Sequence, residues 1–212
     1  MPRCIASLLV VCLVLAVMPA LGQVLYEDGP VNGTTDAWTI NFGYIVSNTF
    51  TLTSSATVTG FDIYSWLFPG DVLLTVDYLM TSQEFGGTTY ASGTAKITDS
   101  FISLNQYGYE IHEDTASGLN INLGAGTYWL NLANASVASG DPVYWDENSG
   151  IGCHSPGCPS EVSENSEGTI PPESFDVTGS YGGGTTPEPS DIWLFGSGLL
   201  GLAAVLRRKL WQ

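Results

Sequence analysis

Residues 72–80 read VLLTVDYLM, a run dominated by apolar side chains with polar ones interspersed. Successive side chains of a β-strand point to opposite faces of the sheet. We therefore expect a strand here with one apolar face, formed by Val72, Leu74, Val76 and Tyr78.

Comparable runs recur between residues 34 and 178, rich in Thr, Val, Ile and aromatic residues and separated by Gly, Asn, Asp, Pro and Ser. Such composition is typical of all-β proteins, and no segment of this region has the pattern of a helix. Around Gly60 the apolar phase slips between Val58 and Phe61, which predicts a β-bulge. The expected strands are 37–40, 49–53, 57–64, 72–80, 89–97, 101–104, 109–112, 119–123, 127–132, 143–145 and 174–177.

Short strands with turn signals between them predict an all-β domain, an antiparallel β-sandwich with jelly-roll or immunoglobulin-like connections. The segment Gly126-Thr127-Tyr128-Trp129-Leu130 resembles the late strand of bacterial extracellular sandwich modules, several of which bind sugars.

The N-terminus has the layout of a cleaved secretory signal peptide. Arg3 precedes an apolar stretch over residues 4–18, which is followed by Pro19 and the small-residue site Ala20-Leu21-Gly22. We expect cleavage after residue 22, so that Cys4 and Cys12 leave with the signal peptide.

The C-terminus carries three features in order: Pro187-Glu188-Pro189, an apolar run over 192–206, and Arg207-Arg208-Lys209. The run has 15 residues, about 22 Å of helix against a hydrocarbon core of about 30 Å, so we expect a short transmembrane helix. By the positive-inside rule the basic cluster stays in the cytoplasm and the body lies across the membrane. A plain tail anchor would account for the helix and the basic cluster, but not for the Pro-Glu-Pro motif.

This ending resembles the PEP-CTERM sorting signal of exported bacterial proteins. The resemblance implies recognition by a membrane-embedded enzyme of the exosortase type, which cuts near the motif and removes the helix. It also implies export across the inner membrane, transient anchoring, and a final location at the cell surface or outside the cell. The expected domains are a signal peptide (1–22), a β-sandwich (23–178), a flexible linker (179–186) and the sorting signal (187–212).

The exported body is strongly acidic. Between Gln23 and Thr186 there are 19 acidic residues and one basic residue, Lys96, a formal charge of −18 without the histidines. Such a surface repels phosphate backbones, so nucleic-acid binding is not expected. Cations are the natural small partners, although the same charge also serves solubility.

Cys153 and Cys158 are the only cysteines left after signal cleavage, and they bracket the turn-forming residues His154-Ser155-Pro156-Gly157. Outside the cytoplasm this arrangement predicts a disulfide. The alternative is a metal site using both thiolates with His154 and His112.

The body contains none of the common catalytic motifs, so we expect no enzyme and no cofactor. Hydrolysis of glycosides by paired carboxylates remains the alternative, because that chemistry needs only two acids at about 5–10 Å.

The densest cluster of polar and aromatic residues is the segment 141–150. An exposed ring of Tyr144 or Trp145, flanked by Asp146, Glu147 and Asn148, would stack on a sugar and bond its hydroxyls. The same oxygens with Asp141 would alternatively suit Ca²⁺. A third reading is a core tryptophan followed by a solvated acidic turn. The expected function is a non-enzymatic interaction or structural role outside the cell, with extracellular polysaccharide as a candidate ligand.

Overall fold

The computed structural model describes residues 22–182. The predicted sorting motif, its helix and all of the signal peptide except Gly22 lie outside this part. Of the predicted linker, residues 179–181 belong to the last strand.

Regular structure in residues 22–182 consists of strands, joined by turns and loops. Within these residues there is no helix with the length and apolar character needed to span a membrane. The strands are β1 (Gln23–Glu27), β2 (Asp36–Thr39), β3 (Ile45–Leu52), β4 (Ala56–Leu67), β5 (Leu73–Gln83), β6 (Gly86–Leu104), β7 (Glu110–Leu123), β8 (Gly126–Val137), β9 (Tyr144–Glu147), β10 (Val162–Glu164), β11 (Gly168–Ile170) and β12 (Phe175–Tyr181).

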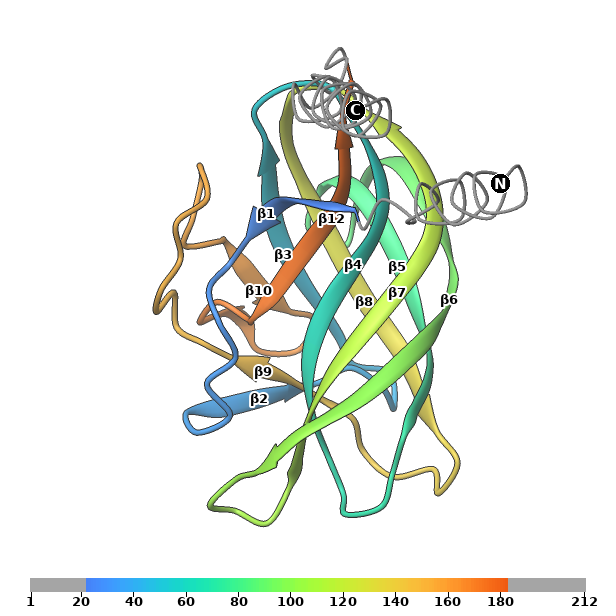
Figure 1. Ribbon diagram of the computed structural model, residues 1–212, viewed down its shortest axis with the longest axis vertical. Coiled ribbons are helices and arrows are strands. Elements are labelled where there is room, and N and C mark those ends of the chain that lie inside the picture. Colours follow the sequence, from blue (N-terminus) through green and yellow to red (C-terminus); the bar gives the residue numbers. More distant parts are fainter. Residues whose placement is uncertain (1–21, 183–212) are drawn as a thin grey trace, which may run out of the picture. The chain divides into compact units, whose positions relative to one another are not determined.

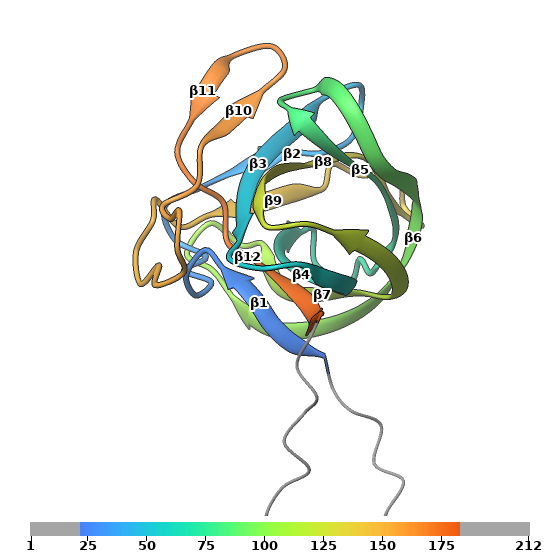
Figure 2. The same ribbon diagram turned by 90° about the horizontal axis from the view of Figure 1, so that it is seen from above.

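The strands form one antiparallel sheet in the order β1-β12-β4-β7-β6-β5-β8-β3-β10-β11. Strand β6 joins its two halves, because residues 86–96 pair with β5 and residues 97–104 pair with β7. Seen from above, the strands from β3 through β8, β5, β6 and β7 to β4 surround a common interior (Figure 2). The expected all-β, antiparallel fold is therefore confirmed, as a curled sheet.

Strands β2 and β9 lie off this path and position the segment of greatest interest. They pair with each other and lie side by side at the lower left of the view in Figure 1. Strand β9 also pairs with β4 through Ser65 and Trp66, and Glu147 at its end forms a bridge to Glu173.

Aromatic side chains from both halves of the sheet fill the interior. Tyr26 contacts Phe175 and Phe50, with ring centroids 5.5 and 6.4 Å apart, and Phe50 stacks on Tyr128 at 5.5 Å. Trp145 meets Phe175 edge to face at 5.6 Å. These contacts connect β1, β3, β8, β9 and β12, so burial of the rings stabilises the closure of the sheet.

The bulge expected at Gly60 is confirmed, since the β4–β7 register shifts between Val58 and Gly60. A side chain at Gly60 would meet the carbonyl oxygen of Ala116 at 2.2 Å, which explains the glycine.

The apolar face expected for residues 72–80 is wrong in its first half. Val72 and Leu74 are 49% and 47% exposed, whereas Leu73 and Val76 are fully buried. The cause is the register shift between Leu73 and Thr75 in the pairing of β5 with β8, which places an extra residue in β5. This extra residue changes the inward-facing side chains from odd-numbered to even-numbered positions.

Candidate functional site

The segment expected to bind a ligand is largely buried. Strand β9 places Trp145 and Glu147 on one face and Tyr144 and Asp146 on the other, because side chains alternate along a strand. Tyr144 is half-buried, while Trp145, Asp146, Glu147 and Asn148 are all buried.

Trp145 belongs to the core and is not a stacking platform. Its side chain is fully buried, and its Nε1 donates a hydrogen bond to the main-chain oxygen of Ser174 at 2.8 Å. Of the readings that the sequence allowed for this ring, the core tryptophan is the one observed.

Tyr144 lies on the opposite face, within a second aromatic group. Its ring meets Tyr109 edge to face at 5.6 Å, and Tyr109 in turn contacts Trp66 and Phe68. Tyr107, which is 56% exposed, stacks on Trp66 at 5.7 Å. The half-buried ring of Tyr144 therefore packs within this aromatic group and is not exposed as a stacking surface.

Asp146 is a buried carboxylate whose hydrogen bonds are satisfied. Its Oδ1 accepts bonds from Trp66 Nε1 at 2.6 Å and Gly33 N at 2.9 Å, and its Oδ2 accepts one from Asn32 N at 3.0 Å. Burial raises the pKa of Asp146 to about 6, and these three donors oppose the rise because they favour the charged form. The carboxylate thus anchors the loop before β2, and it is not an acidic turn in solvent.

Glu147 and Asn148 are also engaged in bonds within the fold. Glu147 accepts bonds from Trp38 Nε1 at 3.3 Å and Ser149 Oγ at 2.7 Å. Asn148 donates to the main-chain oxygen of Asp28 and accepts from Gly150 N at 2.7 Å. The calcium ligands expected from the sequence, including Asp141, point to different neighbours and do not converge.

The expected disulfide between Cys153 and Cys158 is present. Beneath it lies the buried carboxylate of Asp28, which accepts bonds from the hydroxyl and the main-chain nitrogen of Ser160. Burial raises the pKa of Asp28 to about 6, and the bonds from Ser160 oppose that rise. This network attaches the disulfide loop to the end of β1.

The metal alternative for the cysteines is not supported. Both sulfurs are in the disulfide, so neither is a thiolate, and the only acid gathered with them is Asp28 among the described residues. His112 lies elsewhere, on β7, with Nδ1 2.8 Å from Asp99 Oδ1 and Nε2 3.4 Å from Glu110 Oε2.

Two buried carboxylate pairs occur where strands bring acids opposite each other. Asp99 on β6 faces Asp114 on β7, and Glu147 faces Glu173 across the bridge at the end of β9. The pKa of Asp114 is raised well above its ordinary value, chiefly by burial and further by Asp99. Neither pair lines the hollow formed by residues 41–42 and 134–141 or the hollow formed by residues 31–34, 102–105 and 111.

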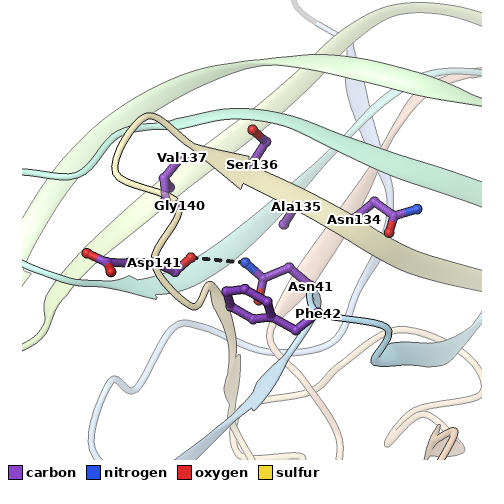
Figure 3. Close-up of a pocket in the computed structure, with 8 residues that line it drawn as sticks. All are labelled: Asn41, Phe42, Asn134, Ala135, Ser136, Val137, Gly140 and Asp141. Carbon is purple, nitrogen blue, oxygen red and sulfur yellow. Dashed lines mark hydrogen bonds between the residues drawn. The ribbon is translucent and has the colours of Figure 1, made fainter.

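The larger of these hollows is open to solvent and lies where the β2–β3 turn meets the end of β8. It has a volume of about 340 Å³ and is shown in Figure 3. Its lining residues are Asn41, Phe42, Asn134, Ala135, Ser136, Val137, Gly140 and Asp141. The side-chain amide of Asn41 donates a hydrogen bond to the main-chain oxygen of Asp141 at 3.0 Å, drawn as the dashed line in Figure 3. This bond joins two segments that line the hollow.

Phe42 is held in an unusual backbone conformation at this hollow. Tyr44 N donates to Asn41 O at 3.0 Å, and φ is 56° at Phe42 and 91° at Gly43, the values of a type I′ turn. The first central position of this turn ordinarily carries Asn, Asp or Gly, and a bulky residue there costs about 1 kcal/mol or more. Nevertheless the ring is 65% exposed, so burial does not offset that cost.

Two polar side chains that line this hollow have oxygens without a partner in the described fold. Asn134 also has a positive φ, 50°, and its Nδ2 donates to Asp77 Oδ2 at 2.9 Å, which leaves its side-chain oxygen without a partner among the described residues. The main-chain groups of Asp141 are bonded to Asn41 and Ser139, and its carboxylate has no bond within residues 22–182. In Figure 3 the carboxylate of Asp141 and the amide of Asn134 point away from the Phe42 ring, so the exposed ring is the feature of this hollow that suits stacking on a sugar.

Sequence reasoning missed Phe42 and Asn134. A signal was present, because an aromatic residue directly before Gly43 and between two strands is an unusual turn residue. Comparison of the chain with protein-family models found no match, and a search of curated proteins likewise found no relative.

Proposed function

We propose that this chain is an exported, non-enzymatic protein of the cell surface or extracellular matrix, and that it binds extracellular polysaccharide at the hollow around Phe42. The observation that carries the proposal is the Phe42 ring, 65% exposed on a left-handed backbone beside an open hollow. Strain of this kind persists at functional positions, where the surrounding structure maintains it.

A screen of the purified chain on a glycan array, with and without Ca²⁺, tests this proposal. Binding is expected to fall in Phe42→Asn, since Asn accepts a positive φ and removes only the ring. The matched control is Phe101→Asn, whose ring is 56% exposed on β6 and lines neither hollow. Equal loss in both variants, or no glycan bound at all, would reject the site.

Export is supported by the sequence features at the two ends of the chain. We infer a cleaved signal peptide, sorting by an enzyme of the exosortase type at Pro187-Glu188-Pro189, and removal of the helix over 192–206 with Arg207, Arg208 and Lys209. Intact-mass measurement of protein from the native host tests this route. Mature protein that retains Trp193 and Arg207 would leave a plain tail anchor instead.

We also propose that the curled sheet is a distorted sandwich of two layers that share β6. Support comes from the pairing, which sets β12, β4 and β7 on one side of β6 and β5, β8 and β3 on the other. Hydrolysis by paired carboxylates is not favoured, because Asp114, Glu147 and Glu173 are all buried and away from the hollow.

A further inference from the structure

Three carboxylates lie side by side where β2, β9 and the residue before β12 pair with one another. Asp36 on β2 is in register with Glu147 on β9, and Glu147 is bridged to Glu173. Partners in a β-ladder have their side chains on the same face, so the three form a row, called here the carboxylate ladder. Like charges directly opposite each other are destabilising.

The Glu147–Glu173 step of the ladder is especially close. The flanking bonds run from Ser174 N to Asp146 O at 2.8 Å and from Asn148 N to Pro172 O at 3.0 Å. Glu147 and Glu173 are therefore a non-hydrogen-bonded pair, the type in which opposite side chains approach most closely.

Glu173 is buried without any partner. Its side chain is fully buried, and it is the only carboxylate in residues 22–182 of which both oxygens are buried and unbonded. Burial, and then the charge of Glu147, raise its pKa well above the ordinary value. A buried charge in this position is costly unless a counter-charge is present.

The described side chains supply no such counter-charge. Lys96 is the one Lys or Arg in residues 22–182, and it lies on β6 opposite Thr75. His112 is bonded to Asp99 and Glu110 on another part of the sheet, and His154 lies in the exposed disulfide loop.

A shared proton is a weaker explanation. No hydrogen bond joins Glu173 to Glu147, because both side-chain oxygens of Glu173 are without a partner. A protonated Glu173 would bury an O–H group without an acceptor, which is itself unfavourable.

We propose that the carboxylate ladder of Asp36, Glu147 and Glu173 binds Ca²⁺. Calcium prefers several hard oxygen ligands in a flexible geometry, and Ser149 Oγ, 2.7 Å from Glu147 Oε1, is a further oxygen within reach. The three carboxylates are not gathered as tightly as ligands around an ion. Asp36 is exposed, so we expect it to move toward the other two, and it gives the ion a route from solvent.

The structure provides an optical probe for this site. Trp38 Nε1 donates to Glu147 Oε2 at 3.3 Å, so its indole ring adjoins the ladder. Tb³⁺ takes the same hard oxygen ligands as Ca²⁺ and emits when a neighbouring tryptophan is excited. We therefore expect tryptophan-sensitised Tb³⁺ emission from the purified chain, and we expect added Ca²⁺ to displace it.

Variants separate this site from the general acidity of the surface. Glu173→Gln and Glu147→Gln are expected to weaken Tb³⁺ and Ca²⁺ binding roughly tenfold or more each, because ligand charge sets affinity. Asp36→Asn is expected to weaken binding less than the two Gln variants do. Because Asp36 is exposed, this change should leave the fold intact, so a loss of binding in Asp36→Asn would not be due to misfolding. Glu164→Gln, a buried acid on β10 with one unbonded oxygen, and Asp176→Asn on β12 are expected to bind as the parent does.

Calcium is also expected to raise the melting temperature of the parent chain but not that of Glu173→Gln. The proposal is overturned if Tb³⁺ emission is absent, if Ca²⁺ does not displace it, or if Asp176→Asn abolishes it while Glu173→Gln does not. No change in the melting temperature of the parent chain when Ca²⁺ is added would likewise overturn it. None of these outcomes depends on glycan binding.

Discussion

The segment Tyr144–Asn148 and the hollow at Phe42 both combine aromatic rings with carboxyl and amide groups, yet they differ in what those groups contact. In the segment, Trp145 and Asp146 are fully buried and bonded to the fold. At the hollow, Phe42 is 65% exposed and the Asp141 carboxylate has no bond within residues 22–182. The same residue types thus stabilise the fold in one place and are open to a ligand in the other. Burial, more than composition, distinguishes the two roles.

The largest difference is expected when the two rings are truncated. Trp145→Ala removes a fully buried side chain and should lower the free energy of unfolding by about 3–5 kcal/mol. Phe42→Ala removes an exposed ring and should change it by less than about 0.5 kcal/mol. Urea unfolding of both variants measures the contrast, and similar losses would contradict it.

The two aspartates should differ next. Asp146→Asn retains one oxygen but turns an NH₂ group toward donors from Asn32, Gly33 and Trp66, so we expect a loss of about 2–3 kcal/mol. Asp141→Asn replaces a carboxylate without described bonds and should alter stability by no more than about 0.5 kcal/mol. Chemical denaturation at neutral pH measures the free energy of unfolding of both variants. If Asp146→Asn is as stable as the parent chain, the three donors must find other partners.

The pH dependence follows from the buried acids. Burial raises the pKa of Asp28 and Asp146 to about 6 and that of Asp176 to about 7, so the folded chain holds protons that the unfolded chain has lost. Stability contributed by these groups is complete below their unfolded pKa near 4 and is lost as pH rises through about 6 to 7.

The melting temperature in EDTA should therefore be higher at pH 5 than at pH 8. Asp176→Asn should flatten the upper part of this profile. A melting temperature that rises steadily from pH 5 to pH 8 would show that these carboxyl groups ionise in the fold without penalty.

The smallest effect is expected at the strained turn. Phe42→Asn should raise the free energy of unfolding by about 0.5–1 kcal/mol, because Asn tolerates the positive φ that Phe does not. The same change at Phe101, on strand β6, should lower it slightly, since Asn is a poor strand residue. Opposite signs in thermal unfolding would identify backbone strain at Phe42, and matching signs would remove that explanation.

Much of the fold could be predicted from the alternation of apolar and polar residues along the strands. The predictions that were wrong have physical reasons. The expected strands 89–97 and 101–104 form one strand, β6, and 109–112 and 119–123 form another, β7. Polar and glycine residues interrupt the apolar pattern in both strands; most of them are exposed or half-buried, and Asp114 is a buried polar residue within β7. Strands β10 and β11 have three residues each, too few for any period to appear.

The candidate sites were harder to predict, because they depend on which segments meet. Glu173 follows two prolines and has no local signal of a partner; its role arises from the bridge to Glu147, 26 positions earlier in the chain. Tyr144 and Trp145 lie on opposite faces of β9, as side chains of a strand alternate. The sequence does not show that other aromatic rings contact both of them.

Strand β6 has a consequence for the cooperativity of unfolding. Because its 19 residues are bonded to β5 at one end and to β7 at the other, neither half of the sheet retains all its hydrogen bonds when the other half opens. Amide hydrogens of β5, β6 and β7 should therefore exchange together, in a single global event, while those of the three-residue strands β10 and β11 exchange earlier by local fraying. A cut within β6 should likewise yield two fragments that fold only in each other's presence.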